Sequence, residues 1–201
     1  MIIGDKSQFA IESGITQAYE RLSFRALGFF VIHIAAHTYG VQNPDATLLA
    51  CSFDEVQRRI ARRGTHHASC AIEPDPAMIA EAFHAAIYAP DQQARCFFGI
   101  PQLEVRSLIY ENNLSWSPDG DEAFDDGSHV IHFDIEDRVR LIGYKVKQAT
   151  DHRRLILNSV SDVWLAADSF YSILKRWRDA FEAEWMALPK IPTSKDGAER
   201  T

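Results

Sequence analysis

The sequence is poor in the features that mark secreted and membrane proteins. Its 201 residues contain only three cysteines, Cys51, Cys70 and Cys96, at unrelated spacings and with no Cys-x-x-Cys pair. This argues against a disulfide framework and against a four-thiolate zinc site. The first residues lack the basic start and apolar stretch of a signal peptide, and no apolar run approaches membrane-spanning length. We therefore expect a cytoplasmic protein with no membrane partner.

Motifs of common enzymes are also missing. The chain has no Gly-rich phosphate loop, no Gly-x-Ser-x-Gly elbow and no recognisable Cys/His nucleophile pair. Five residues could supply metal ligands, but their spacing defines no complete ligand set: His132 and Asp134, with His66, His67 and Cys70. A metal-assisted hydrolase that uses them stays open as an alternative function. The leading expectation is a protein that is not an enzyme and holds no metal or cofactor.

Basic residues are absent from one 20-residue stretch, residues 118–137, which contains eight carboxylates. The whole chain has 21 basic and 28 acidic residues, a net charge of −7, so the other 181 positions sum to +1. Charge concentrated in this way can attract a basic partner, whereas evenly spread charge mainly confers solubility. The alternative is a solvated acidic loop with no partner.

Aromatic residues beside these carboxylates could anchor a partner that the charge attracts. Trp116 and Phe124 are the predicted anchors. The complete predicted binding surface consists of Trp116, Asp119, Asp121, Glu122, Phe124, Asp125, Asp126, Asp134, Glu136 and Asp137. Assembly with identical copies of the chain stays open.

A second concentration of charge is basic and comprises Arg58, Arg59, Arg62 and Arg63. A basic helix face can bind phosphates, so a nucleic-acid-binding regulator that uses this helix is a further alternative. It is less favoured, because cations in a last helical turn offset the helix dipole and often pair with nearby carboxylates. The rest of the chain has neither a strong positive charge nor a recognisable nucleic-acid motif.

The first part of the chain predicts two strands followed by three helices. Residues 9–12 and 29–36 are rich in β-branched and aromatic residues and predict strands. Ser52 and Glu55 have the spacing of a capping box, and Gly64 predicts the end of that helix. A second helix is predicted from Asp75-Pro76 to Pro90, and a third from Pro101 to about Asn112.

The second part predicts three strands and a long helix. Apolar residues alternate over 130–136, which predicts a half-buried strand, and residues 139–146 and 155–165 predict two further strands in antiparallel pairing. A continuous apolar stripe predicts a final helix with Asp168 as its N-cap and Pro189 at its end. We therefore expect a single α+β domain over residues 1–189, mainly an antiparallel sheet packed with helices, and a flexible tail over 190–201.

Short motifs spread over most of the chain resemble those of the immunity protein 42 family. They are Met1-Ile-Ile-Gly-Asp-Lys-Ser-Gln-Phe-Ala-Ile-Glu12, Gly28-Phe-Phe-Val-Ile, Tyr39-Gly40, Ser52-Phe-Asp-Glu-Val, Val163-Trp-Leu and Phe170-Tyr-Ser-Ile-Leu. The resemblance implies a bacterial cytoplasmic protein that protects its producer by binding and blocking a cognate polymorphic toxin, and it supplies no catalytic residue. The family pattern has an Asn-Gly-like turn after the second strand, where this chain has Ala35-Ala36.

Overall fold

Two mainly antiparallel sheets are stacked in the structure, a computed structural model that describes residues 1–89, 95–116, 121–147 and 156–192. The first sheet has six strands, with β1, β2, β3 and β4 side by side, β5 on β3, and β11 parallel to β2. Its strands are β1 (Ile2–Asp5), β2 (Phe9–Tyr19), β3 (Ala26–Ile34), β4 (His37–Tyr39), β5 (Thr47–Leu48) and β11 (Lys190–Ile191).

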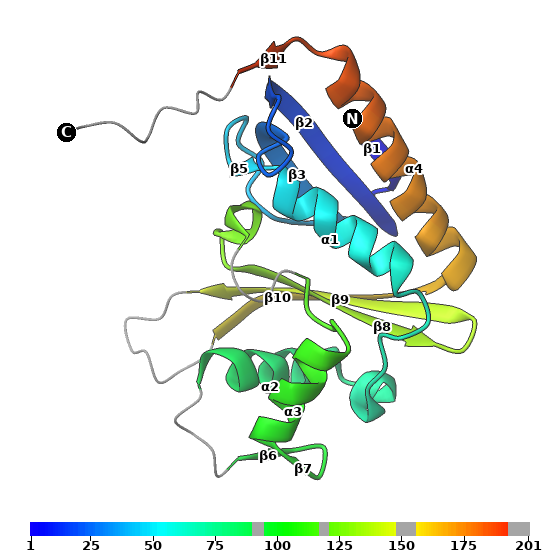
Figure 1. Ribbon diagram of the computed structural model, residues 1–201. Helices are drawn as coiled ribbons and strands as arrows, with labels where there is room; N and C mark the ends of the chain where they lie inside the picture. Colours follow the sequence, from blue (N-terminus) through cyan, green and yellow to red (C-terminus); the bar gives the residue numbers. More distant parts are fainter. Residues whose placement is uncertain (90–94, 117–120, 148–155, 193–201) are drawn as a thin grey trace, which may run out of the picture.

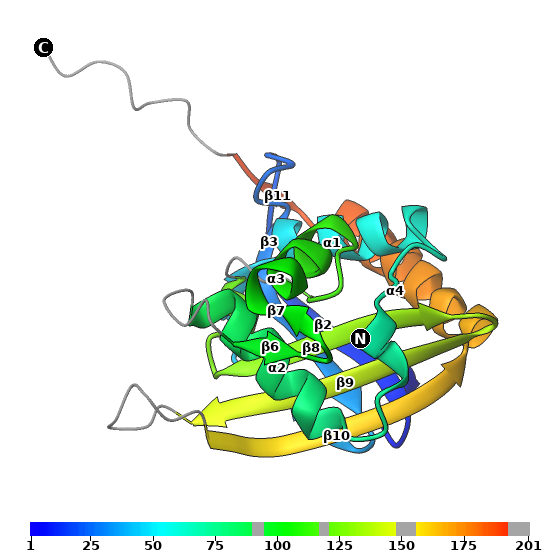
Figure 2. The ribbon, with the colours of Figure 1, turned by 90° about the horizontal axis from the view of Figure 1, so that it is seen from below.

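The second sheet is an antiparallel meander of β8 (Ser128–Ile135), β9 (Arg138–Lys147) and β10 (Ile156–Ala166), in the order β10-β9-β8. The antiparallel pairing predicted from the alternating pattern is confirmed. Seen from below, the strands of this sheet cross those of the first sheet, and β10 is its outermost strand (Figure 2). A small separate ladder joins β6 (Cys96–Phe97) to β7 (Ile100–Pro101).

The helices lie on both sides of the second sheet (Figure 1). On one side, α1 (Ala50–Ala61) and α4 (Ala167–Ala187) pack on each other and lie over the first sheet, with η2 (Glu122–Phe124) beside β3. On the other side lie η1 (Ser69–Ile72), α2 (Pro76–Tyr88) and α3 (Gln102–Glu111). The fold is therefore a single α+β domain, as predicted, and none of its described helices is long and apolar enough to cross a membrane.

The prediction that β8 is half-buried is wrong, because both of its faces are buried. Ile131 and Phe133 belong to the core under α2 and α3, whereas Val130 belongs to the core shared with α1 and α4. His132 and Asp134, which looked like solvent-facing positions, are 0% and 5% exposed. The alternating pattern identifies one apolar face, but the polar residues of the other face are buried with hydrogen-bonding partners.

The capping box predicted for α1 is not formed. Leu49 is the N-cap and makes no side-chain capping bond, so Ser52 lies inside the first turn. The Ser52 hydroxyl donates instead to Asp121 at 2.9 Å, and Glu55 pairs with Arg59 at 2.8 Å. Ser52 thus bonds to a residue distant in sequence, and Glu55 to a residue one helical turn ahead. The local spacing of the two residues does not reveal these partners.

The other helices follow their sequence signals closely. Asp75 caps α2 by accepting a hydrogen bond from the Ala77 amide at 2.9 Å. On α4 the predicted apolar stripe is confirmed, with Phe170, Trp177 and Phe181 fully buried. Asp168, however, lies within the first turn of α4 and Ala166 is the N-cap. The predicted tail also begins too early, because Lys190–Ile191 form β11; residues 193–201 lie outside the described part of the chain.

The turn between β3 and β4 has the backbone geometry that Asn-Gly favours, although its residues are alanines. Ile34 pairs with His37, so Ala35 and Ala36 form a two-residue loop. Both have positive φ, 49° and 66°, as a type I′ turn requires. Their amides donate to the carbonyls of Gln8 and Lys6 in the neighbouring turn. These bonds offset the cost of left-handed alanine, and the departure from the family pattern leaves the hairpin intact.

Candidate docking surface

The predicted acidic surface is divided between the two ends of β8. The strand has eight residues, so its ends are separated by about 25 Å at roughly 3.3 Å per residue. Asp121 to Asp126 lie before its first residue, and Glu136 and Asp137 form the turn after its last. Carboxylates that are close in sequence are therefore distributed over two separate regions, and Asp119 lies outside the described residues.

At the first end, Asp121 is an internal side chain and holds three segments together. It is 5% exposed and accepts hydrogen bonds from the Ser52 hydroxyl at 2.9 Å, the Thr47 hydroxyl at 3.1 Å and the Ala123 amide at 3.0 Å. These donors come from α1, β5 and η2, so the carboxylate ties η2 to the first sheet. Asp121 is not available to a partner.

The two predicted aromatic anchors are also internal, which corrects the expectation that they are accessible. Trp116 is 2% exposed, and the Arg59 guanidinium lies 4.3 Å from its ring centre. Phe124 is 9% exposed and meets Phe30 edge to face, with 6.4 Å between ring centres. Both rings complete the core between the sheets, where their removal from water stabilises the fold. Sequence position beside charged residues did not indicate exposure.

Three carboxylates at this end remain exposed: Glu122, Asp125 and Asp126. Asp126 is partly neutralised, because the Lys145 ammonium lies 2.5 Å from one of its oxygens. This surface therefore retains Glu122 and Asp125 as carboxylates for which no salt bridge is found among the described residues.

At the second end, Asp134 is buried beneath a pocket and accepts several hydrogen bonds. Its oxygens accept hydrogen bonds from the Tyr171 hydroxyl at 2.8 Å, the Gly64 amide at 2.7 Å and the His66 amide at 3.2 Å. Burial alone would raise the pKa of Asp134, but hydrogen bonds from His132, Tyr171 and His66 outweigh it and lower the pKa well below its usual range. Asp134 is therefore an ionised structural acceptor.

A buried polar network continues inward from Asp134. The Nε2 atom of His132 lies 3.4 Å from Asp134, and its Nδ1 atom accepts a hydrogen bond from Arg59 at 2.9 Å. Because a guanidinium can only donate, this contact assigns the ring proton to Nε2. Burial, with the charge of Arg59 close by, lowers the pKa of His132 to about 3. His132 is neutral at pH 7.

Arg59 completes the network. Because it is buried, it does not contribute to the basic surface that was predicted for α1. It is fully buried, with Nε 2.8 Å from Glu55 and a hydrogen bond of 2.9 Å to the Ser115 carbonyl. The other three arginines of this segment also have partners within the chain. Arg58 pairs with Glu55, Arg62 bonds the Glu111 carbonyl and Arg63 pairs with Asp168. The arrangement gives no support to a nucleic-acid-binding helix.

The residues considered as metal ligands serve other purposes. His66 Nδ1 contacts the Asn112 carbonyl at 2.9 Å, and His67 Nδ1 contacts the Asp134 carbonyl at 2.9 Å. Cys70 lies in the other core, under α2 and α3. In the part of the chain that the structure describes, no three His, Cys, Asp or Glu side chains are arranged to hold a metal ion. The hydrolase alternative gains no support from this geometry.

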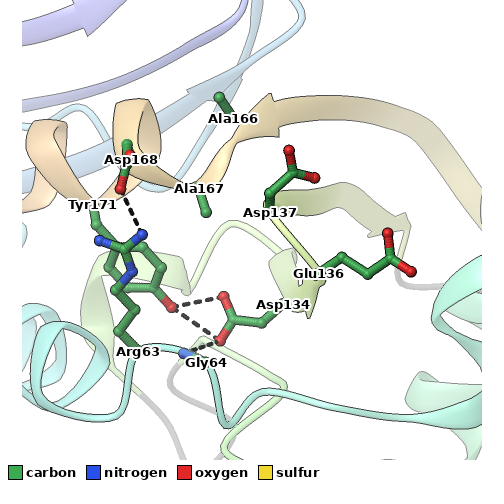
Figure 3. A pocket seen from close by; sticks show the side chains of 9 residues that line it. All are labelled: Arg63, Gly64, Asp134, Glu136, Asp137, Ala166, Ala167, Asp168 and Tyr171. Atoms are coloured by element: carbon green, nitrogen blue, oxygen red, sulfur yellow. Dashed lines mark hydrogen bonds and ion pairs between the residues drawn. The ribbon is translucent and has the colours of Figure 1, made fainter.

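A pocket of about 200 Å³ opens above Asp134, where three segments meet. Its walls are the residues that follow α1, the end of β8 with the β8–β9 turn, and the start of α4, as Figure 3 shows. Four carboxylates line it, from Asp134, Glu136, Asp137 and Asp168, together with one guanidinium, from Arg63. Arg63 pairs with Asp168 at 2.6 Å and lies 5.0 Å from the Tyr171 ring centre. The pocket is predominantly acidic.

Sequence reasoning found part of this pocket and missed the rest. Asp134, Glu136 and Asp137 were predicted site residues, and the structure brings them together. Arg63 and Asp168 were assigned to other roles and Tyr171 to none, because they come from segments distant in sequence. Only the chain path from β10 into α4 places Asp168 beside the turn, where the Ala167 amide donates to the Asp137 carbonyl.

Comparisons with known proteins place this geometry in context. Among solved structures, the chain is similar to CdiI from Burkholderia dolosa AUO158, with a TM-score of 0.55, 15% sequence identity, and coverage of 90% of this chain and 99% of the other. This likeness concerns the fold alone. A search of curated proteins gave no match. The sequence itself matches the family model described as immunity protein 42 over residues 1–180. Since that match covers most of the chain, the protein belongs to the immunity protein 42 family.

Proposed function

We propose that this chain is an immunity protein that binds and neutralises a cognate polymorphic toxin in the bacterial cytoplasm. The observation that carries the proposal is the family match over residues 1–180. Neutralisation is by occlusion of the toxin's active or substrate-binding surface, which requires a shaped and charged surface rather than a reactive group. The chain is accordingly proposed not to be an enzyme, and its buried His132, Asp134 and Arg59 to be structural.

We further propose that the acidic pocket is the main docking site for the toxin. Glu136 and Asp137 are exposed at the β8–β9 turn and Asp168 at the start of α4, so their charges face solvent. A concentrated negative field would speed the encounter with a toxin that has a basic surface. Glu122 and Asp125, about 25 Å away along β8, would contribute to steering without lining a pocket.

The experiment compares paired neutralisations at the two ends of β8. Glu136→Gln with Asp137→Asn removes two charges at the pocket, and Glu122→Gln with Asp125→Asn removes two at the other end. Association and dissociation with the toxin encoded beside this chain are measured at two salt concentrations. The pocket variant should slow association by about tenfold at low salt, and the control variant by about twofold.

Protection of growing cells that express the toxin gives the second readout. Each variant must first melt like the parent, since a destabilised variant would lose protection for another reason. Equal and unchanged association rates for both variants would exclude both acidic ends as docking sites. Failure of the parent chain to bind or protect would contradict the immunity function itself.

A further inference from the structure

The two sheets differ in how their edges are closed. In the first sheet the edge strands are short, with four residues in β1, three in β4, and two each in β5 and β11. In the second sheet the outer edge of β8 is covered by backbone bonds: the Trp116 amide donates to Val130, His132 to Leu114 and Asp134 to His66, each at 2.8 Å. Across the described ranges, β10 has 11 residues and pairs only with β9. It is the long open edge.

The ladder determines which backbone groups of β10 face outward. On β8 the groups of Val130, His132 and Asp134 point away from β9, so the alternate residues Ile131 and Phe133 bond to β9. Those two residues pair with Ile142 and Arg140, whose backbone groups therefore face β8.

The intervening β9 residues 139, 141 and 143 consequently face β10, where they pair with Leu165, Val163 and Ser161. The N–H and C=O groups of the alternate residues on β10, Val160, Asp162 and Trp164, then point to the open edge. No backbone hydrogen bond involving these groups is found among the described residues. They form a row of three donor and acceptor pairs, repeated about every 6.6 Å.

The edge lacks most of the features by which proteins protect such strands. β10 contains no Pro, Lys or Arg, and its irregularity lies at one end, between Leu157 and Ser159. Its single charge, Asp162, is held by Arg140, which donates from Nε at 3.0 Å and from Nη2 at 2.8 Å. Val160, Val163 and Trp164 are half-buried, so a strand laid along the edge would meet apolar side chains on both faces.

A second copy of the chain fits this edge poorly. Antiparallel self-pairing that used all three outward-facing residues would place Val160 opposite Trp164 of the copy and Asp162 opposite the same residue of the copy. Like charges directly opposite one another destabilise a strand pair, an effect that the Arg140 guanidinium beside each Asp162 reduces. Each copy also has a net charge of −7, whereas a toxin with a basic surface is complementary to it.

We propose that the open edge of β10 receives an extended strand of the toxin, which adds a fourth strand to the second sheet. The inference rests on the proposed function and specifies how the partner is held. Backbone hydrogen bonds to Val160, Asp162 and Trp164 supply affinity with little dependence on sequence, and apolar side chains of the added strand pack beside Val160, Val163 and Trp164.

Residue-resolved amide hydrogen exchange of the full chain, alone and with the inactivated toxin, tests this geometry. In the free chain the amides of Val160, Asp162 and Trp164 should exchange fast, and those of Ser161, Val163 and Leu165 slowly, because the latter bond to β9. In the complex the first set should slow by at least about 100-fold, and the second set should stay slow. A merely nearby contact would not produce this two-residue alternation.

Val160→Pro supplies an independent test, since it removes one outward N–H at an edge position that tolerates proline. Val160→Ala is the matched control, because it shortens the same side chain and keeps the N–H. We expect the proline variant to bind the toxin about tenfold more weakly than the alanine variant. Should the proline variant fail to fold, the exchange pattern of the parent chain decides.

The outcomes separate this inference from the proposed function. Tight binding with unchanged exchange at Val160, Asp162 and Trp164 overturns strand addition and leaves the immunity function standing. Absence of binding overturns both. Protection of the three amides in the free chain, with sedimentation as a dimer, assigns the edge to a second copy and overturns the proposal.

Discussion

The two ends of β8 carry carboxylates in similar numbers and use them differently. Before the strand, Asp121 accepts from two hydroxyls and one amide and joins η2 to α1 and β5. Near the other end of the strand, Asp134 accepts hydrogen bonds from two amides and a hydroxyl at the base of an open pocket. The buried His132 lies next to it and is hydrogen-bonded to the buried Arg59. At each end one carboxylate is structural and its neighbours in sequence are exposed. An acidic run in a sequence is therefore not equivalent to an acidic surface.

The largest expected effect is the loss of Asp134. Asp134→Ala leaves the Gly64 and His66 amides and the Tyr171 hydroxyl without their acceptor and removes the carboxylate beside His132. We expect the free energy of unfolding to fall by about 3 to 5 kcal/mol. Urea unfolding measures it, with Glu136→Ala as the exposed control. A loss below about 1 kcal/mol would contradict the structural role of Asp134.

Asp121→Ala should cost less, about 2 kcal/mol, because two of its three donors are hydroxyls that can turn to other acceptors. Asp121→Asn should cost under about 1 kcal/mol, since the amide oxygen can serve Ala123 and the Ser52 hydroxyl can accept from the amide nitrogen. The same unfolding measurement applies. If Asp121→Asn were as damaging as Asp134→Ala, the negative charge itself would matter at this end as well.

Acidification should destabilise the fold, in part through the buried His132 of β8. The pKa of His132 is about 3 in the folded chain, below its ordinary value of 6.5. Below pH 6.5 this histidine is therefore protonated in the unfolded chain but stays neutral in the folded one. The stability that the neutral His132 contributes is fully present above pH 6.5 and is lost as the pH falls towards 3. For His132 alone the expected loss from pH 7 to pH 5 is about 2 kcal/mol. The lowered pKa of Asp134 adds a loss of the same sign below about pH 4.

Chemical unfolding at pH 7, 6 and 5 measures this slope. His132→Gln, with a side-chain oxygen that can accept from Arg59, is the control and should flatten the profile by about the same 2 kcal/mol. Burial also lowers the pKa of His84 and His129 to about 4, so part of the slope should persist in that variant. An unchanged slope in the variant would mean that His132 is protonated in the folded chain.

These contrasts explain how much of the structure the sequence could predict. Periodicity predicted α2, α3, α4 and the β8–β9–β10 meander, because each buries one regular apolar face. It did not predict β1, β4, β5 or β11, which are two to four residues long and exist only through pairing with β2 or β3. Asp121 and Asp134 were identified as carboxylates of interest but assigned to the surface, since all but one of the donors described for them, the Ala123 amide, come from residues 37 to 74 positions away in sequence.

A smaller effect of opposite sign is expected at the pocket rim. Glu136 has a φ of 54° in the two-residue turn between β8 and β9, a backbone conformation that favours glycine. Glu136→Gly should therefore raise the free energy of unfolding by about 0.5 to 1 kcal/mol while slowing toxin association. Thermal melting and binding kinetics measure the two effects. Slower association without a gain in stability would show that the glutamate is not strained at this position.

The smallest expected effect lies at the first end, at the exposed pair of Lys145 and Asp126. Their atoms lie 2.5 Å apart, but both side chains are partly exposed, so solvent and salt screen the attraction. Lys145→Ala should change the free energy of unfolding by less than about 0.5 kcal/mol. It also makes this end more negative by one charge. If the pocket end faces the toxin, the association rate should stay within about twofold of the parent, whereas a clear acceleration would indicate that the toxin approaches the other end of β8.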